Sequence, residues 1–280
     1  MTVLELQNAH LRMRVTPQGG AVLSLETTSG LPVLRAGQGT RPDDVALFPM
    51  LPLANRVRDN RFRLAGEWRT LPDSPVDAQF FLHGDGWITR WTVAQQAADS
   101  CTLTMRQRHA CGFDYQAELR YTLEEHQLTM AVTLRHLGHQ PMLYGAGFHP
   151  FFALSDDSVL AFSSAGYWPE GEQHLPDGWQ PVPAPDADFN QPRPLADRWQ
   201  NVGYSAWSGI ATLSQAAMTV TLAASTPWLM LYHPPGEPFV CLEPQTHPVD
   251  AHSMPGQPGL VLLHAGEMLH FSASIGVKVA

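Results

Sequence analysis

The strongest constraint on the fold is a stretch in the middle of the chain where apolar and polar residues alternate twice. Apolar side chains stand at every second position from Ala117 to Leu123 and again from Leu128 to Leu134, and the polar residues 124–127 separate the two runs. Successive side chains of a strand point to opposite faces, so each run predicts a strand with one buried face. The short polar segment predicts the turn of an antiparallel hairpin.

Similar short apolar runs recur along most of the chain. They lie near residues 11–15, 22–25, 103–105, 210–213, 218–222, 228–232, 239–243, 260–263 and 269–277. The 24 prolines and 22 glycines punctuate them, and no segment carries a sustained helical repeat with caps. Many strands with few helices to cover them predict an all-β protein, a large antiparallel β-sandwich or a barrel.

The segment 167–200 differs from the rest of the chain. It is dense in Pro, Asp, Gly and Trp and lacks alternation. We interpret it as a long ordered loop over one face of a sheet, and loops of this length are often functional. No second composition regime or internal repeat appears, so residues 1–280 are expected to form a single domain.

Composition narrows the classes of function and location. Only 15% of the residues are charged, against about 25% in ordinary soluble proteins, and the net charge is −9. An acidic chain without a basic cluster is not expected to bind nucleic acid. No signal peptide and no apolar stretch of about 20 residues is visible, so we expect a cytoplasmic protein without membrane contact. Three widely spaced cysteines make a disulfide framework or a structural zinc site unexpected.

Glu243 is the first candidate for chemistry. It ends the apolar run 239–242, and Pro244 follows directly. We expect the proline to stop the strand and leave the carboxylate at the edge of the core. A carboxylate that is partly removed from water has a raised pKa, which suits a general acid or base. The alternative is a glutamate at a strand end that simply points into water.

Two further segments place an ionisable side chain after apolar residues. His149 lies between aromatic residues and before Pro150, where a shielded imidazole could act as a general acid near neutral pH. Arg56 comes after the apolar, proline-bearing run 48–52, and a guanidinium there could hold hydroxyls or a carboxylate. The alternative for Arg56 is an exposed arginine.

A fourth segment surrounds His83. This histidine follows three apolar residues and precedes two glycines within four positions, which predicts an imidazole beside a tight backbone turn. Trp87 and Trp91 could supply a flat apolar face that suits the C–H face of a sugar ring. The alternative is a core tryptophan pair with a hydrogen-bonded histidine.

Other catalytic classes find less support. His247 and His252 lack the spacing of a helical zinc pair, and the prolines nearby disfavour a helix. No GxSxG, GxGxxG or GxxxxGK motif occurs. We therefore expect neither a metal nor another cofactor.

Taken in order, the four segments resemble the aldose 1-epimerase (galactose mutarotase) family. The matching pieces are ANRVRDNRF, LHGDGW, GFHPFF and CLEPQTHPVDAH, and the ending PGLVLLHAGEMLHFSASIGV is similar to the closing strands of the family. The resemblance implies a large antiparallel β-sandwich with a sugar cleft. It also implies interconversion of the α and β anomers of a free monosaccharide without a cofactor, by a monomer or homodimer.

The resemblance assigns a role to each candidate. Glu243 matches the catalytic base, His149 the general acid, His83 the second active-site histidine and Arg56 the arginine that holds sugar hydroxyls. The sequence departs from the family at one point, because Asn201 stands where galactose-type enzymes carry an aspartate that binds sugar hydroxyls.

Asp188 or Asp197 could fill that role if the alignment slips. The chain looks closer to a less characterised bacterial branch than to the hexose-6-phosphate branch, which should offer more cations.

Two alternatives stay open at this point. The departure at Asn201 motivates a non-catalytic carbohydrate-binding or sugar-sensing protein on the same scaffold. A glycosidase or lyase would need a second carboxylate facing Glu243 across the substrate. Asp250 is the candidate, but it follows Glu243 closely through two prolines.

Overall fold

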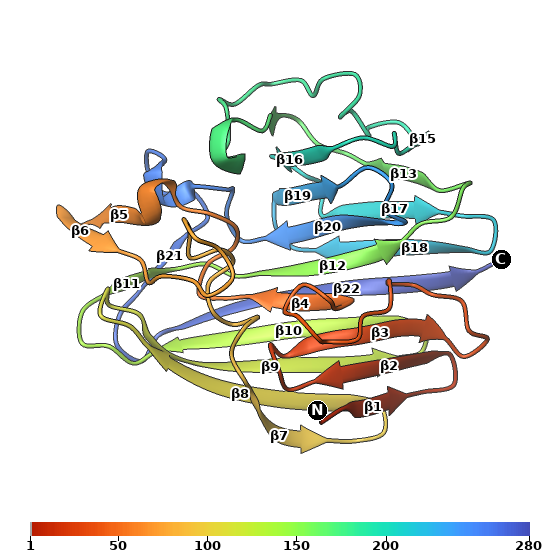
Figure 1. Ribbon diagram of the computed structural model, residues 1–280, viewed down its shortest axis with the longest axis horizontal. Coiled ribbons are helices and arrows are strands. Elements are labelled where there is room, and N and C mark those ends of the chain that lie inside the picture. The colour runs from red at the N-terminus through yellow and green to blue at the C-terminus, as the bar shows by residue number, and fades with distance from the viewer. Residues whose placement is uncertain (1) are drawn as a thin grey trace.

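Two nine-stranded antiparallel sheets stack face to face in the computed structural model, which describes residues 2–280 (Figure 1). In spatial order the first sheet contains β1 (Leu4–Gln7), β2 (Leu11–Thr16), β3 (Ala21–Thr27), β4 (Leu47–Met50), β12 (Gly147–Ala153), β20 (Phe239–Gln245), β19 (Trp228–His233), β16 (Gln200–Tyr204) and β14 (Tyr167–Trp168). The second contains β15 (Arg193–Pro194), β13 (Val159–Phe162), β17 (Ile210–Ser214), β18 (Met218–Ala224), β22 (Met268–Val279), β10 (Gln127–His136), β9 (Asp114–Glu124), β8 (Ser100–Arg108) and β7 (Thr92–Gln96). The predicted all-β antiparallel sandwich is confirmed.

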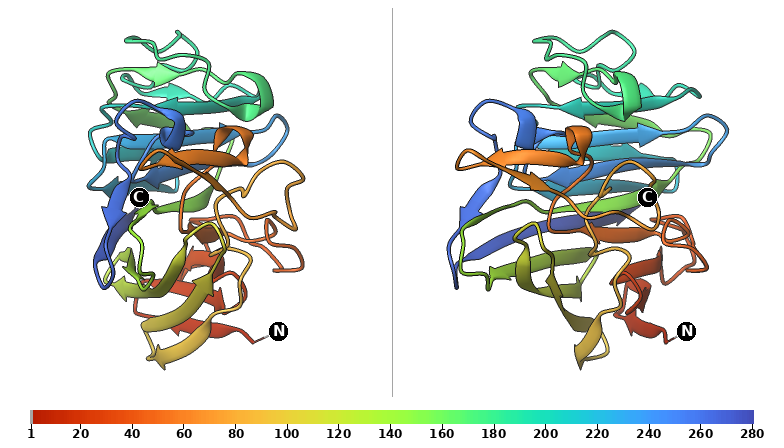
Figure 2. Two further views of the ribbon diagram at one scale, coloured as in Figure 1. Left: turned by 90° about the vertical axis from the view of Figure 1, so that its left-hand side faces the viewer. Right: turned by 60° about the vertical axis from the view of Figure 1, so that its left-hand side comes forward.

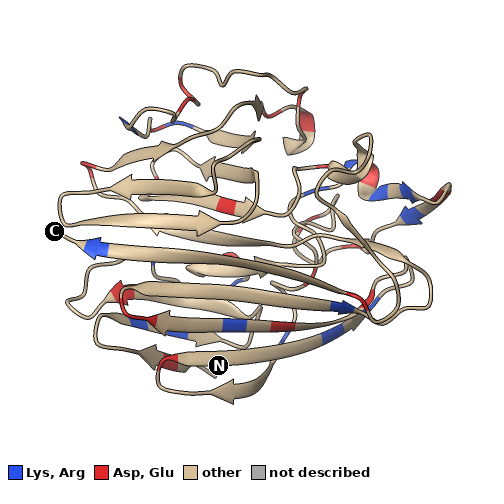
Figure 3. Ribbon diagram, turned by 180° about the vertical axis from the view of Figure 1, so that it is seen from behind, with Lys and Arg blue, Asp and Glu red and all other residues tan. Residues whose placement is uncertain are grey.

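The remaining elements are short. There are two two-stranded sheets, one of β5 (Arg61–Leu64) and β6 (Glu67–Thr70), the other of β11 (Met142–Tyr144) and β21 (Val261–Leu263). Three 3₁₀ turns are η1 (Arg58–Asn60), η2 (Glu172–His174) and η3 (Ala251–Ser253). Within residues 2–280, no helix has the length and apolar character to cross a membrane. Seen from behind, the central strands carry few charged residues, whereas Lys and Arg gather on the protruding β5–β6 hairpin (Figure 3).

The central hairpin forms as the alternation predicts. β9 and β10 pair from Tyr115 with His136 up to Glu124 with Gln127, which leaves two residues in the turn. The first of them, Glu125, adopts a left-handed backbone conformation with φ of 48°. Buried and exposed positions alternate along β9, so the apolar face of the hairpin packs into the molecule.

The main core lies between the two sheets, whose strands are seen from two further directions in Figure 2. The ring of Phe148 in β12 stacks on Phe271 in β22, with centroids 5.8 Å apart, and so joins one sheet to the other. Because side chains alternate along a strand, the neighbours of Phe148 point to the opposite, outer face of the first sheet. A second, smaller apolar cluster covers that outer face and includes Phe48, Phe151 and Cys241.

Strand β20 runs further than the sequence predicts. All of its residues from Phe239 to Gln245 are buried, and Pro244 pairs in register with Leu229 of β19. The expectation that Pro244 ends the strand is therefore wrong. A proline keeps an extended backbone and lacks only the N–H donor, so it fits a strand where that donor has no partner.

The ladder between β12 and β20 is interrupted at the place where both strands carry a proline. It pairs Gly147 with Gln245 and Phe151 with Cys241, and it skips the three residues between them on each strand. Pro150 and Pro244 both lie in the skipped stretch. The two strands are thus held together on either side of a gap in the middle of the sheet.

The segment 167–200 is largely irregular, as predicted. It leads from the edge strand β14 of the first sheet to the edge strand β15 of the second, at the top of Figure 1. Much of it therefore closes one end of the sandwich. Its two ends, near residues 170–176 and 199, return to the outer face of the first sheet.

Candidate active site

A cleft of about 160 Å³ lies on the outer face of the first sheet. Its lining comprises Asn55, Arg56, His83, His149, His174, Trp199, Asn201, Tyr232 and Glu243. Five of the six residues that the sequence analysis proposed for the site are in this set. They come from strands β12, β20 and β16 of the first sheet and from the segment 51–91, so the fold brings together parts of the chain that are far apart in sequence.

The floor of the cleft holds a histidine and a carboxylate in direct contact. The pairing of Gly147 with Gln245 and of Phe151 with Cys241 places His149 opposite Glu243, inside the gap of the ladder. His149 Nε2 lies 3.1 Å from Glu243 Oε1.

The second carboxylate oxygen of Glu243, Oε2, accepts a hydrogen bond of 3.1 Å from Gln245 Nε2. Glu243 is buried, with 2% of its surface exposed. Both carboxylate oxygens therefore have partners.

Burial moves the pKa values of this pair in opposite directions. Burial raises the pKa of Glu243 to about 8, although the Gln245 hydrogen bond and the charge of Arg56 oppose the rise. Burial, with repulsion from the Arg35 guanidinium, lowers the pKa of His149 to about 3. The two groups touch and titrate together. Near neutral pH the pair therefore holds one dissociable proton, and these two shifts place it on the Glu243 carboxyl while no ligand is bound.

Aromatic rings fix the orientation of His149. Its ring stacks on Phe48 with centroids 4.5 Å apart, and Phe151 lies 4.7 Å away. The Arg35 guanidinium in turn lies 3.6 Å from the centroid of Phe151. His149 Nδ1 is buried and has no hydrogen-bond partner within residues 2–280. Packing, rather than a second hydrogen bond, thus holds the imidazole toward Glu243.

His83 is held by a reciprocal contact with Asn55. The backbone N–H of Asn55 donates to His83 Nδ1 at 3.1 Å, and the backbone N–H of His83 donates to the Asn55 carbonyl at 2.9 Å. Burial lowers the pKa of His83 well below its ordinary value, so the ring is neutral. Since Nδ1 accepts, the ring proton is on Nε2, which leaves an N–H donor.

The backbone at this contact is strained. Asn55 and His83 both have positive φ, of 60° and 56°. Such conformations persist where the surrounding structure enforces them, which is common at functional sites.

Arg56 supplies a partly buried guanidinium without an ion-pair partner among residues 2–280. Its NH1 group donates to Asn55 Oδ1 at 3.2 Å, while its Nε has no partner within residues 2–280. Burial lowers its pKa from the usual arginine value. No carboxylate of the described chain lies within 4 Å of it, so its remaining N–H groups are available to a ligand.

Trp87 is the one proposed site residue that lies outside the cleft lining. Its Nε1 donates to the carbonyls of Leu82 and Gly84, and its ring stacks on Phe48 at 4.8 Å. It therefore supports His83 and Phe48 from behind. A direct contact of Trp87 with a ligand remains a prediction that this geometry does not favour.

The aspartates that the sequence offered as alternatives are engaged by other partners. Asp188 accepts hydrogen bonds from Asn190, and Asp197 accepts one from the backbone of Gly236. Asp250 accepts from the backbone N–H of Arg58 and forms an ion pair with its side chain. None of the three lines the cleft, whereas Asn201 does.

Several residues of the site escaped the sequence analysis. Gln245 could have been found, because it lies two positions from Glu243 on the same face of β20, whereas Tyr232 has no proposed site residue beside it on β19. Glu170, His174 and Trp199 belong to the irregular segment, which has no periodicity to reveal direction. Within residues 2–280, no group of three or more His, Cys, Asp or Glu side chains is arranged to hold a metal ion.

Comparison with known proteins shows which family the chain belongs to. Residues 2–276 match the family model described as aldose 1-epimerase. The chain belongs to the aldose 1-epimerase family. It is 32% identical over 293 residues to the uncharacterized protein YphB of Escherichia coli K12, with 99% of each chain covered.

Solved structures of the family have the same fold. The crystal structure of a candidate aldose 1-epimerase from Escherichia coli K12 has a TM-score of 0.95 and 30% identity, and the match covers 100% of this chain and 99% of that one. Galactose 1-epimerase from Lactobacillus acidophilus has a TM-score of 0.82 at 17% identity, over 99% of this chain and 94% of that one, which shows a shared fold.

Proposed function

We propose that this aldose 1-epimerase family member interconverts the α and β anomers of a free monosaccharide by acid–base catalysis. One observation supports the proposal most directly: His149 Nε2 and Glu243 Oε1 lie 3.1 Å apart on the cleft floor. In a cyclic sugar, the anomeric hydroxyl oxygen and the ring oxygen are bonded to the same carbon. A base and an acid that act on these two oxygens must therefore stand side by side.

The reaction follows from one proton on the pair. Once the shared proton moves from Glu243 to His149 across their contact, Glu243 is an ionised base that takes the proton of the C1 hydroxyl, and His149 gives its proton to the ring oxygen. The C1–O5 bond breaks, which leaves an aldehyde at C1 and a hydroxyl at C5. Rotation about C1–C2 and closure with the roles reversed produce the other anomer, and the pair ends with the protons it had at the start.

The neighbouring groups suit the oxygens around this centre. His83 Nε2–H and the Arg56 guanidinium are donors that can hold the ring oxygen or hydroxyls, and both are oriented before a ligand arrives. Burial strengthens each of these electrostatic contacts relative to water.

The test is anomeric exchange measured by polarimetry or NMR on D-glucose, D-galactose, D-xylose and L-arabinose. We expect acceleration of at least one sugar. Glu243→Gln and His149→Asn should each lower kcat by roughly 10²–10⁴-fold. Glu67→Gln and His139→Asn change exposed residues of the same types and should leave the rate unchanged. Sugar binding without exchange would instead support a non-catalytic carbohydrate-binding protein.

A further inference from the structure

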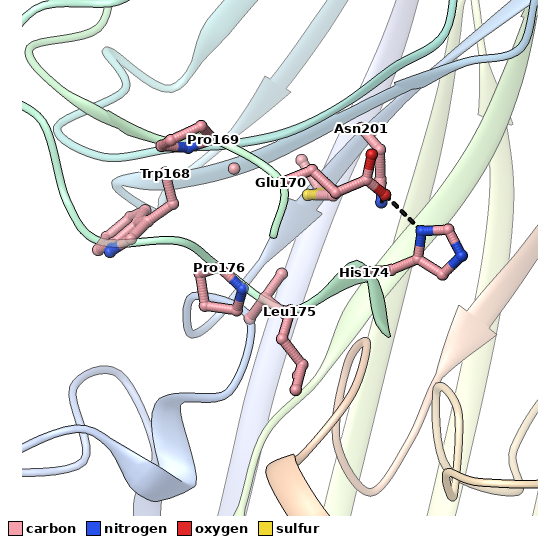
Figure 4. A pocket seen from close by; sticks show the side chains of 10 residues that line it. Trp168, Pro169, Glu170, His174, Leu175, Pro176 and Asn201 are labelled. Carbon is pink, nitrogen blue, oxygen red and sulfur yellow. Dashed lines mark hydrogen bonds and ion pairs between the residues drawn. The ribbon is translucent and has the colours of Figure 1, made fainter. Parts of the chain in front are cut away.

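The cleft has a second polar centre away from His149 and Glu243. Asn201, His174 and Trp199, which we call the far wall, all line the cleft. Each of them directs a nitrogen toward the carboxylate of Glu170, a residue that the sequence analysis did not single out. Figure 4 shows the Glu170 carboxylate turned toward Asn201 and His174.

Three hydrogen bonds converge on Glu170. Asn201 Nδ2 donates to Oε1 at 2.5 Å, and Trp199 Nε1 donates to Oε2 at 2.6 Å. His174 Nδ1 contacts Oε1 as well. Burial opposes ionisation of Glu170, but the hydrogen bonds from Asn201, His174 and Trp199 outweigh it and lower its pKa. The carboxylate is therefore ionised near neutral pH and acts only as an acceptor.

The cavity behind Glu170 is small and mostly apolar, so it supplies few hydrogen-bond donors to the carboxylate. The cavity in Figure 4 measures about 10 Å³, room for one water molecule at most, and its lining includes Trp168, Leu175 and Met230. An ionised carboxylate needs hydrogen-bond donors to offset its burial. The far wall supplies the donors that we find for Glu170.

This arrangement fixes which atom of Asn201 meets the cleft. An amide can present either its oxygen or its nitrogen, but only the nitrogen can donate to a carboxylate. With Nδ2 bonded to Glu170, the carbonyl oxygen Oδ1 is the atom left for a ligand, and it has no hydrogen-bond donor within residues 2–280. The same reasoning applies to His174, where Nδ1 is engaged and Nε2 is left.

The backbone of the turn 170–176 is strained in a way that is common at functional sites. Gln173 and His174 are consecutive non-glycine residues with positive φ, of 57° and 61°. The chain turns sharply there, and residues 170 and 176 bridge across the turn. That geometry returns the imidazole of His174 onto Glu170, four residues earlier. Strain of this kind persists where the surrounding contacts over-determine it.

We propose that Glu170 is a positioning residue that makes the far wall a hydrogen-bond acceptor for sugar hydroxyls remote from the anomeric carbon. The inference rests on the proposed function for the identity of the ligand as an aldopyranose. Asn201 lies two strands across and two residues along from Glu243, since Glu243 pairs with Met230 and Asn201 pairs with Tyr232. Two strand spacings of about 4.8 Å and two residues at about 3.4 Å give a separation of roughly 12 Å between the backbones.

One pyranose ring with a hydrogen bond at each end fits that separation. With C1 at Glu243, the far wall meets the hydroxyls at the opposite side of the ring, near C3 and C4. The exposed indole of Trp199, in edge contact with Tyr232 at 5.3 Å, lies beside these hydroxyls. The site should therefore prefer sugars that carry free hydroxyls at C3 and C4 over their deoxy forms.

The experiment exchanges the two partners. Glu170→Gln removes the fixed acceptor and lets Asn201 turn either way. Asn201→Asp places a carboxylate against Glu170. The double variant Glu170→Gln with Asn201→Asp restores one carboxylate and one amide in exchanged positions, and it keeps an acceptor oxygen toward the cleft. Glu172→Gln, on the same turn but exposed, is the matched control.

Binding is measured by calorimetry with D-glucose, D-galactose and their 3-deoxy and 4-deoxy forms, and anomeric exchange is measured separately. We expect Glu170→Gln and Asn201→Asp each to raise Kd and KM by about tenfold to a hundredfold, with a smaller change in kcat. The double variant should recover most of the loss. Discrimination against the deoxy sugars should shrink in the single variants and return in the double variant.

The outcomes separate this inference from the proposed function. If Glu170→Gln weakens sugar binding but the wild-type protein catalyses no anomeric exchange, the catalytic proposal is refuted and the role of Glu170 in sugar binding is supported. Exchange at the wild-type rate, with Kd and deoxy discrimination unchanged in both single variants, would overturn the role of Glu170. A double variant as weak as Asn201→Asp alone would do the same, because the pair would not act through its hydrogen bond. Failure of the wild-type protein to bind any of these sugars would also overturn it.

Discussion

At the scale of single residues, Glu243 sets the chemistry of the cleft. Its carboxyl is buried, and its pKa is raised to about 8, while the pKa of His149 is lowered to about 3. The reaction proposed above requires one proton on the pair. That protonation state spans the pH range between the two values, and it is lost when the pH rises above about 8.

The rate should therefore fall on the alkaline side. We expect kcat/KM for the best substrate to drop about tenfold per pH unit above about pH 8, because the acid then lacks its proton. The measurement is a pH–rate profile between pH 6 and 10, corrected for the uncatalysed exchange, which base also accelerates. A rate that stays level to pH 10 would contradict the assignment of the shared proton.

The same shift affects stability with a definite sign. Between about pH 4.5 and 8, the unfolded chain releases the Glu243 proton while the folded protein retains it, so this group costs stability as the pH rises. Glu243→Gln should raise the free energy of unfolding at pH 8 by on the order of a few kcal/mol, and by much less at pH 5. Urea denaturation at the two pH values measures the difference. Equal effects at both would argue against a buried, protonated carboxyl.

At the scale of elements, the segment 51–91 positions Arg56 and His83 through close backbone contacts. Gly84 has a φ of 67°, and a Cβ at this position would lie 2.0 Å from the carbonyl oxygen of Leu51. The turn after His83 therefore requires glycine for space as well as for conformation.

Gly84→Ala should lower both stability and activity, since the loop must move to relieve the clash. Gly66 is the matched control, because its φ is 84° but an added Cβ would meet no atom within 4 Å. Gly66→Ala should show only the backbone penalty of about 1–2 kcal/mol. We expect Gly84→Ala to exceed it by at least 2 kcal/mol in thermal or urea denaturation. Similar losses in the two variants would show that the contact with Leu51 is not limiting.

The elements also show where sequence reasoning succeeds and where it fails. Alternation located β9, β10 and their turn, because a single buried face leaves a period-two pattern. It misjudged β20, which is buried on both faces, so that its apolar run gave no sign of where the strand ends. A proline that normally ends a strand is tolerated at position 244 because the neighbouring ladder is already open there.

At the scale of the whole molecule, four buried histidines make the free energy of unfolding depend on pH in the acidic range. Burial lowers the pKa of His83, His149, His247 and His252, to about 4 in the case of His247. Below about pH 6.5 the unfolded chain binds protons at these positions that the folded protein does not bind. Their contribution to stability is present above that pH and is lost as the pH falls.

We therefore expect stability to be highest near pH 6.5 and to fall steeply toward pH 4. His252 has both ring nitrogens buried and without partners within residues 2–280, so it should contribute strongly. The melting temperature measured from pH 4 to 9 tests this, with His139→Asn, an exposed site, as the control for His252→Asn. A melting temperature that does not change between pH 4 and 6.5 would contradict the burial of these rings.

The arrangement of the sheets explains why the site was only partly predictable. Four short motifs, taken in their order along the chain, pointed to Arg56, His83, His149 and Glu243, because each motif carries its polar residue within a few positions of sequence. All four residues line the cleft. The order β4-β12-β20-β19-β16 joins strands from distant parts of the chain, and no local pattern specifies it. Glu170 reaches the cleft only through this long-range assembly, and its role depends on a partner 31 residues away.

The open stretch of ladder between β12 and β20 has a consequence for the bound state. His149 and Glu243 face each other there, and their side-chain contact bridges the two strands where backbone pairing is skipped. A sugar that bonds to both groups through O1 and O5 would take the place of that contact. The substrate would then link β12 and β20 through these two side chains on the outer face of the first sheet, and ring opening would change that link.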